Sequence, residues 1–249
     1  MKTKFLAIIL LISTTLYANK QDLIIYCGIT MVKPIKEIAK IIEKENGVNI
    51  LISQGGSKDL YDQLKASKVG DLYLPGSDSY VKKGLVDKLI EDRVEIGFNQ
   101  AAIFVQKGNP KKVKDLDALV DENLVVAICD PKSGSIGRMS KKILTKYKGE
   151  DFFYDVYDAA AQIGTDSRNL NKSLIDKNVD VSLNWRASGF WLENSAHIDV
   201  IDINEKYAPK KKLVLSLLEF SKNKDLAKKF MDYTSSDEGQ KIMEKYGFR

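Results

Sequence analysis

The chain has 249 residues, enough for one large domain or two of modest size. Hydrophobic residues make up 44% and charged residues 29%, as in an ordinary globular protein. The formal net charge is +5, but both signs are interspersed, and the densest basic cluster is Lys210–Lys212. Binding of nucleic acid needs a basic face with base-reading partners, so we expect no nucleic-acid partner.

The first 18 residues have the pattern of a secretory signal peptide. MKTK is a short positive segment, and FLAIILLISTTLY is apolar but too short for a membrane-spanning helix, which takes about 20 residues. Ala18 is a suitable small residue before a cleavage site. We therefore expect residues 1–18 to be removed and the mature protein to be exported to the periplasm.

The first hundred residues alternate between apolar runs and helical patterns. Buried strands are predicted at residues 22–27, 47–52 and 69–75. Helical patterns follow them at residues 31–46, 58–68 and 76–87. Thr30 is the expected N-cap of the first helix, and Gly47 is expected to end it. This alternation favours a parallel sheet with helices on its faces.

A second series of strands and helices begins near residue 100. Its strands are predicted at residues 101–110, 124–130, 179–185, 197–203 and 212–220. Its helices are predicted at residues 113–121, 139–147 and 164–178, with two more over 224–248 and a loop at 131–138. We therefore expect an α/β fold of two doubly wound domains, residues 19–99 plus 209–249 and residues 100–208. Two crossings, near residues 97–102 and 204–211, would form the hinge.

Four clusters of Gly, Ser and Thr open predicted helices. They are GIT (28–30), QGGS (54–57), KSGSIG (132–137) and GTDS (164–167). A helix N-terminus exposes unpaired N–H groups and a partial positive charge, and glycine lets an anion approach the backbone closely. In open parallel sheets, ligands bind beyond the carboxyl ends of the strands. The clusters predict an anion site, and simple helix capping is the alternative for each of them.

Other sequence motifs for chemistry are weak. Neither the nucleotide-binding G-x-x-x-x-G-K-[ST] pattern nor GxGxxG is present. SGSIG differs by one residue from the G-x-S-x-G elbow of hydrolases, so a hydrolase that uses Ser135 with Asp180 and His197 stays an alternative. One histidine and two distant cysteines give no metal-ligand spacing. We expect neither a metal site nor a cofactor, and no catalytic residues.

The segment NWRASGFW (184–191) follows a predicted buried strand and contains two tryptophans and an arginine. Arg186 could form a forked bond to an oxyanion, with Trp185 as a wall or an N–H donor. Arg168, beside a helix start in TDSRN (165–169), is a second candidate. The alternative is that Trp191 packs in the core and Arg186 lies on the surface.

At these motifs the chain resembles the periplasmic solute-binding proteins of ABC importers, and among them the molybdate/tungstate-binding group. The resemblance covers nearly the whole mature chain and includes CDPKSGSIGR, which is similar to a D-P-x-x-x-x-x-G-R loop of the family. It implies two domains that close on an anion, delivery to an ABC permease, and no catalysis. We expect such a protein to act as a monomer.

The resemblance also implies which residues hold the anion. Mapped onto this chain, the ligand-binding positions are Thr30, Gly56, Ser57, Ser135, Ile136 and Ser167, with Trp185 where the family usually has tyrosine. Arg168 and Arg186 are more basic than the family pattern requires. They keep phosphate, a phosphate ester or an organic carboxylate open as ligands, and a surface adhesin that retained the binding fold is a further alternative.

The two cysteines, Cys27 and Cys129, each end an apolar run. An exported protein with an even number of cysteines could form a disulfide. In the expected arrangement, however, the two thiols lie on opposite domains near the cleft, where a disulfide would lock it. We therefore expect free thiols.

Overall fold

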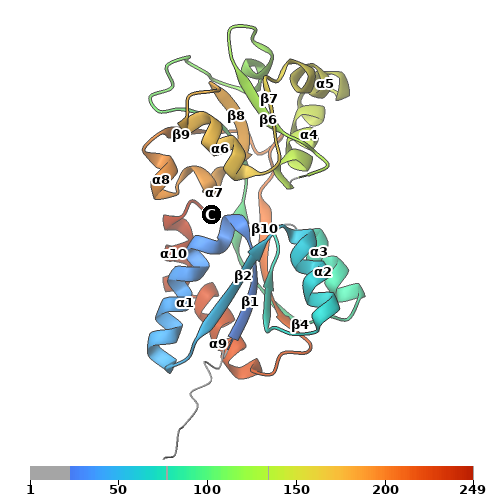
Figure 1. Ribbon diagram of the computed structural model, residues 1–249, viewed down its shortest axis with the longest axis vertical. Coiled ribbons are helices and arrows are strands. Elements are labelled where there is room, and N and C mark those ends of the chain that lie inside the picture. The colour runs from blue at the N-terminus through green and yellow to red at the C-terminus, as the bar shows by residue number, and fades with distance from the viewer. Residues whose placement is uncertain (1–22, 77, 134, 249) are drawn as a thin grey trace, which may run out of the picture.

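The computed structural model describes residues 23–76, 78–133 and 135–248, and it has two lobes joined by chain segments near the middle (Figure 1). The predicted signal peptide, residues 1–18, lies outside the described residues. Within the described residues, no helix is both long enough and apolar enough to cross a membrane.

The lower lobe in Figure 1 is built on a five-stranded sheet in the order β2-β1-β3-β10-β4. Its strands are β1 (Leu23–Gly28), β2 (Ile50–Gly55), β3 (Leu72–Leu74), β4 (Ile90–Asn99) and β10 (Lys211–Leu218). β1 pairs in parallel with β2 and β3, whereas β10 runs antiparallel to both β3 and β4. A strand from the end of the chain thus completes a sheet begun by its first hundred residues.

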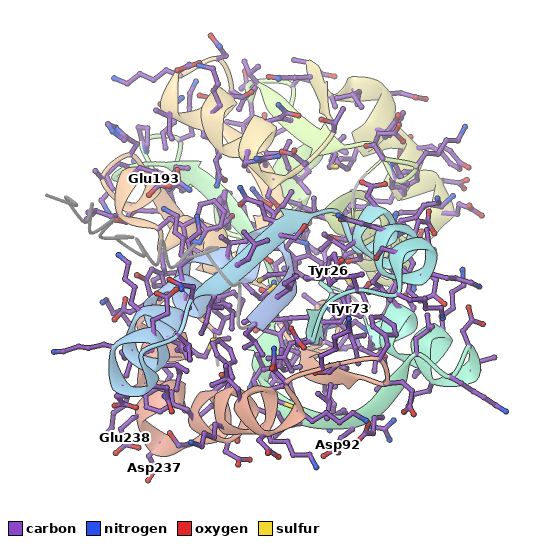
Figure 2. The ribbon with its side chains drawn as sticks, turned by 60° about the horizontal axis from the view of Figure 1, so that its bottom comes forward. Tyr26, Tyr73, Asp92, Glu193, Asp237 and Glu238 are labelled. Carbon is purple, nitrogen blue, oxygen red and sulfur yellow. The ribbon has the colours of Figure 1, made fainter. Side chains whose placement is uncertain are left out.

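Helices cover both faces of this lower sheet. They are α1 (Val32–Asn46), α2 (Ser57–Ser67), α3 (Asp78–Val86), α9 (Lys224–Ser235) and α10 (Asp237–Lys245). On one face, α1, α9 and α10 bury a core that includes Ile35 and Phe230. On the other face, Tyr26 and Tyr73 occupy paired positions on β1 and β3 and pack in one cluster with Tyr61 of α2 (Figure 2).

The upper lobe contains a second five-stranded sheet in the order β7-β6-β8-β5-β9. Its strands are β5 (Ala101–Gln106), β6 (Val126–Cys129), β7 (Gln162–Gly164), β8 (Val181–Trp185) and β9 (Ile198–Asp202). Its helices are α4 (Ser135–Lys148), α5 (Glu150–Ala159), α6 (Ser167–Ile175), α7 (Arg186–Gly189) and α8 (Leu192–Ser195). β6 is parallel to β7 and β8, and β5 is antiparallel to β8 and β9. The predicted class of two doubly wound α/β lobes is confirmed.

The chain crosses between the lobes twice, and Gln100 connects the two crossings. The first crossing joins β4 to β5 at Gln100, and the second leads from β9 to β10. The buried Gln100 side chain donates from Nε2 to the carbonyl oxygens of Ala208, at 2.8 Å, and Ile203, at 3.4 Å. The limits 19–99 plus 209–249 and 100–208 stay a prediction, which the membership of the two sheets supports.

Several local predictions were wrong or missing. α1 begins at Val32 rather than directly after Thr30, because a 3-10 turn, η1 (Ile29–Met31), separates it from β1; Thr30 is therefore not its N-cap. Gly47 ends α1 in a left-handed conformation, as predicted. The segment 113–121 forms only a second 3-10 turn, η2 (Leu116–Val120), and α4 starts at Ser135, inside the predicted loop. No prediction covered β4, α5, β7, α7 or α8.

Candidate anion-binding cleft

A cleft of about 520 Å³ lies between the two lobes, at the carboxyl ends of the parallel strands. The lower lobe lines it with the segment after β1, the start of α2 and the loop after β3, through Gly28, Ile29, Thr30, Gly55, Gly56, Ser57, Lys58, Asp59, Gly76 and Tyr80. The upper lobe lines it with the starts of α4 and α6 and the end of β8, through Lys132, Ser133, Ser135, Ile136, Arg138, Thr165, Asp166, Ser167, Arg168 and Trp185. Ligands of open parallel sheets bind in this position, beyond the carboxyl ends of the strands.

The cleft brings together eight of the nine residues predicted from the sequence. These are Thr30, Gly56, Ser57, Ser135, Ile136, Ser167, Arg168 and Trp185. They come from both lobes, so a ligand that touched them all would bridge the lobes. The ninth residue, Arg186, does not line the cleft.

On the lower wall, the start of α2 offers donors to an anion. Gly56 precedes the helix in an extended conformation and, as a glycine, has no side chain with which to cap it. Among the described residues no side-chain cap of α2 is found, so its first amide N–H groups suit an anion. Ser57 Oγ accepts a hydrogen bond from the Gly76 amide at 3.0 Å. Because a hydroxyl has one donor and two acceptor sites, the Ser57 O–H remains available to donate.

On the upper wall, Ser135 opens α4 and has the same pattern of hydrogen bonding. Its Oγ accepts from the indole Nε1 of Trp185 at 3.1 Å. Trp185 is buried at the end of β8, so its ring is fixed by packing. Its N–H is used within the protein, which leaves the Ser135 hydroxyl hydrogen available to a ligand. Two serines, one from each lobe, are thereby prepared as donors.

The start of α6 is different from the starts of α2 and α4. Asp166 caps this helix by accepting from the amides of Arg168 at 2.7 Å and Asn169 at 3.1 Å. The Arg168 guanidinium also lies 3.3 Å from the Asp166 carboxylate. The four predicted Gly/Ser/Thr clusters are therefore not equivalent. At the start of α6 the Asp166 carboxylate already accepts hydrogen bonds from amides that an anion would otherwise use. Ser167, which is buried, still lines the cleft.

The cleft also contains charged and aromatic residues that were not predicted as ligand residues. Arg138 lies three residues after Ser135 on α4, and such residues share a face of a helix. Had the helix been predicted to begin at Ser135, this spacing would have identified Arg138. Asp59 adds a negative charge and Tyr80 an aromatic wall, and no sequence signal distinguished either of them.

Arg186 is directed toward the end of the chain. Its Nε forms an ion pair with Asp202 at 2.8 Å, its Nη1 donates to the Gly247 carbonyl at 3.1 Å, and its guanidinium lies 4.4 Å from the centre of the Phe190 ring. The Arg186 side chain is only 13% exposed. These contacts join α7 to the C-terminal turn. The prediction that Arg186 binds the ligand is therefore not supported by its position, because its guanidinium is engaged by Asp202, Gly247 and Phe190 outside the cleft lining.

Ser135, Asp180 and His197, the residues of the hydrolase alternative, do not form a catalytic triad in the structure. The partner of Ser135 Oγ is Trp185, and the Asp180 carboxylate accepts from the Val125 amide at 3.0 Å. His197 is exposed, directly before β9. No group of three or more His, Cys, Asp or Glu suited to a metal ion occurs in the described part of the chain.

Both cysteines are buried, free thiols on different sheets. Cys27 lies on β1 and Cys129 on β6, so the disulfide alternative does not form in this structure. Burial raises the pKa of the Cys27 thiol far above its ordinary value, and burial also raises that of Cys129. Both thiols are therefore poor nucleophiles and poor soft-metal ligands.

Two doubly wound lobes, two crossings and a donor-rich cleft between them define a two-lobed solute-binding protein. The comparison with protein families agrees. Residues 23–249 match the family of bacterial extracellular solute-binding proteins. The chain belongs to this family, so the predicted class is confirmed, and the protein is a binding protein rather than an enzyme.

Curated relatives match along most of the chain. A putative binding protein of Haemophilus influenzae is 25% identical over 247 residues, which are 98% of each chain. A putative ABC transporter substrate-binding lipoprotein of Bacillus subtilis is 26% identical over 241 residues, 95% of this chain and 89% of that one. A sulfate-binding protein of Escherichia coli is 23% identical over 233 residues, 83% of this chain and 71% of that one.

Solved structures share the fold. The substrate-binding domain of a putative molybdenum ABC transporter from Clostridium difficile has a TM-score of 0.75 at 21% identity and covers 91% of this chain and 97% of its own. PEB3 of Campylobacter jejuni with bound L-phospholactate has a TM-score of 0.73 at 19% identity, covering 91% and 99%. At these identities the likeness shows the fold and leaves the ligand open.

Proposed function

We propose that this protein captures a small oxyanion in the cleft between its lobes and delivers it to an ABC permease, with molybdate or tungstate as the favoured ligand. The observation that carries the proposal is the pair Ser57 and Ser135. Each serine accepts a hydrogen bond from its own lobe, and each keeps its O–H to donate. A single anion that accepts from both would hold the two lobes together.

The chemistry of the donors favours an anion that only accepts hydrogen bonds. Molybdate and tungstate carry no proton near neutral pH, so every oxygen is an acceptor. The uncapped first turn of α2 and the two serine hydroxyls supply donors without a fixed full charge. Neutral donors can replace the water around a dianion when the lobes close. The relationship to a putative molybdenum transporter in fold supports this ligand.

A second candidate ligand is an organic anion that carries phosphate, such as a phosphate ester or a phosphorylated carboxylic acid. The cleft volume of about 520 Å³ lies in the usual range for organic ligands, roughly 300–1,000 Å³. Lys132, Arg138 and Arg168 line the upper wall and could bind a second anionic group. The fold shared with PEB3, whose structure contains L-phospholactate, supports this alternative.

Calorimetry with purified mature protein tests both candidates. Molybdate, tungstate, sulfate, phosphate and L-phospholactate are titrated separately. We expect molybdate and tungstate to bind most tightly, and Ser57→Ala and Ser135→Ala each to weaken that binding. Ser235→Ala is the matched control, because Ser235 caps carbonyls within α9, away from the cleft. Binding of L-phospholactate without binding of molybdate or tungstate would replace the first candidate with the second.

The cellular setting is part of the same proposal. After removal of residues 1–18 the protein would work in the periplasm as a monomer, with the division into residues 19–99 plus 209–249 and residues 100–208 setting its two closing halves. N-terminal sequencing of the exported protein tests the cleavage near Ala18. Light scattering during size-exclusion chromatography tests the monomer, and a mass near twice the chain mass would contradict it.

A further inference from the structure

A second contact between the lobes lies outside the lining of the cleft. Lys33, in the first turn of α1, forms an ion pair with Glu193 of α8. The Lys33 Nζ also lies 4.9 Å from the centre of the Trp191 ring. α1 belongs to the lower lobe and α8 to the upper one, and Glu193 is seen at the side of the molecule in Figure 2. We call Lys33, Trp191 and Glu193 the latch.

The latch is close in sequence to cleft residues of both lobes. Lys33 follows Thr30 by three residues, and Trp191 follows Trp185 by six. Thr30 and Trp185 line the cleft from the lower and the upper lobe, respectively. The latch therefore connects the two chain segments whose separation decides whether both walls can reach one anion.

The latch differs from the contact made by the neighbouring α7. The Arg186 amide donates to the Gln100 carbonyl at 2.8 Å, directly at the first crossing, and Ala187 is buried in the core of the lower lobe. These groups lie at the hinge, where little movement is expected. The Lys33–Glu193 pair is partly exposed, with 33% and 55% of the two side chains accessible, so water can replace it when the lobes separate.

The stabilising contacts of the latch are offset in part by an unsatisfied polar group in Trp191. A solvent-exposed ion pair adds little net stability, and a cation over an indole ring adds a modest amount. Trp191 is only 5% exposed, and its Nε1 is buried without a hydrogen-bond partner among the described residues. An unsatisfied buried N–H is unfavourable, which offsets part of the stabilisation from the ion pair and the cation–π contact. The balance makes the lobe equilibrium sensitive to small changes at this contact.

We propose that Lys33, Trp191 and Glu193 are positioning residues of the anion site, which act on affinity by holding the lobes at the binding separation. The proposal rests on the proposed function. It predicts that affinity for the anion depends on opposite charges at Lys33 and Glu193, although neither residue touches the ligand. Lys33 and Glu193 do not line the cleft, and an anion would be repelled by the glutamate and attracted by the lysine if direct charge effects dominated.

Charge reversal separates these effects. We expect Lys33→Glu and Glu193→Lys each to weaken molybdate binding by about 3- to 10-fold, because each places like charges across the lobes. The double reversal restores an ion pair of opposite polarity, so its affinity should return to within about 2-fold of wild type. Lys40→Glu is the control for net charge, since Lys40 is exposed on α1 and its charge acts on Glu37 of the same helix rather than on the upper lobe. Equal effects of Lys33→Glu and Lys40→Glu, or failure of the double reversal, would overturn the proposal.

A readout without ligand keeps the latch distinct from the proposed function. Small-angle scattering of the ligand-free proteins should give a larger radius of gyration for each single reversal than for wild type and for the double reversal. Thermal unfolding should be nearly unchanged in all of them, because the contact is exposed. If wild type binds no molybdate, the proposed ligand fails while scattering still decides the latch. Identical scattering curves for all four proteins would refute it.

Discussion

The indole N–H of Trp185 donates to the hydroxyl oxygen of Ser135 across 3.1 Å, and both residues line the upper wall of the cleft. Trp185 can donate but cannot accept, so it always takes a lone pair of Ser135 and never its hydrogen. A side chain that could do both would leave the direction of the Ser135 O–H undecided. The pair therefore fixes the polarity of one ligand-facing group.

Trp185→Phe should weaken binding of the proposed oxyanion while preserving the fold. The aromatic ring remains, but the N–H that orients Ser135 is lost. A typical neutral hydrogen bond contributes about 1 kcal/mol, so we expect about a 5-fold loss of affinity in calorimetry. In Ser135→Ala there is no hydroxyl left to orient. The double variant should therefore bind as Ser135→Ala alone does, and simple addition of the two losses would show that Trp185 acts by another route.

Gly137→Ala should destabilise the upper lobe. A Cβ at Gly137 would lie 2.2 Å from the backbone oxygen of Asp130 and 2.7 Å from that of Cys129, so α4 could not stay against the end of β6. Overpacking of this kind costs about 1–3 kcal/mol, which chemical denaturation would measure. Gly76→Ala is the control, because its nearest neighbour would be Ser57 Oγ at 3.6 Å. Equal stability of the two variants would mean that α4 can shift without cost.

The sequence was most informative where burial is simple. Strands buried on both faces, such as β1 and β6, consist of continuous apolar residues, and both were predicted. β4 was missed because it is an edge strand whose charged residues are exposed and interrupt the apolar pattern; they include Arg93 and Asp92, which is labelled in Figure 2. The local pattern of apolar and polar residues reflects burial. An edge strand such as β4 forms instead because it pairs with another strand, here β10, which lies more than a hundred residues further along the chain.

For the candidate site, the sequence predicted which chain segments reach the cleft better than it predicted which way individual side chains point. The Gly- and Ser-rich segments reach the cleft because the carboxyl ends of parallel strands meet at one edge of each sheet. Arg186 was misplaced because the chain turns into α7 directly after Trp185, which directs the two neighbouring side chains differently. No sequence signal marked Gly247, the distant carbonyl that Arg186 contacts.

The two thiols should be hidden from reagents in the native protein. Cys27 and Cys129 are buried, and burial raises the pKa of both, so little thiolate forms even at mildly alkaline pH. We expect slow reaction with a thiol reagent in native protein and two equivalents per chain after unfolding without reductant. Finding no reactive thiol in the unfolded, non-reduced protein would show that a disulfide forms.

Glu37 should make stability depend on pH through the contact between α1 and the C-terminal segment. Its carboxylate is bonded by Lys245 Nζ at 2.8 Å and by the Tyr246 hydroxyl at 2.7 Å. The bond from Lys245, and then that from Tyr246, lowers the pKa of Glu37 below its ordinary value. Burial and the bond to Glu37 raise the pKa of Tyr246 to about 12, so the phenol stays a donor at neutral pH.

The pKa of Glu37 is lower in the folded than in the unfolded chain. Its stabilisation is therefore complete above the unfolded pKa and disappears as the pH falls through the folded pKa. Glu37→Gln should lower the melting temperature at pH 7, and this difference from wild type should vanish in strong acid, where Glu37 is protonated in both states. Glu122→Gln, at an exposed turn, is the control for removal of one charge. A Glu37→Gln difference that stayed constant from pH 7 into strong acid would show that packing, rather than the carboxylate charge, stabilises this contact.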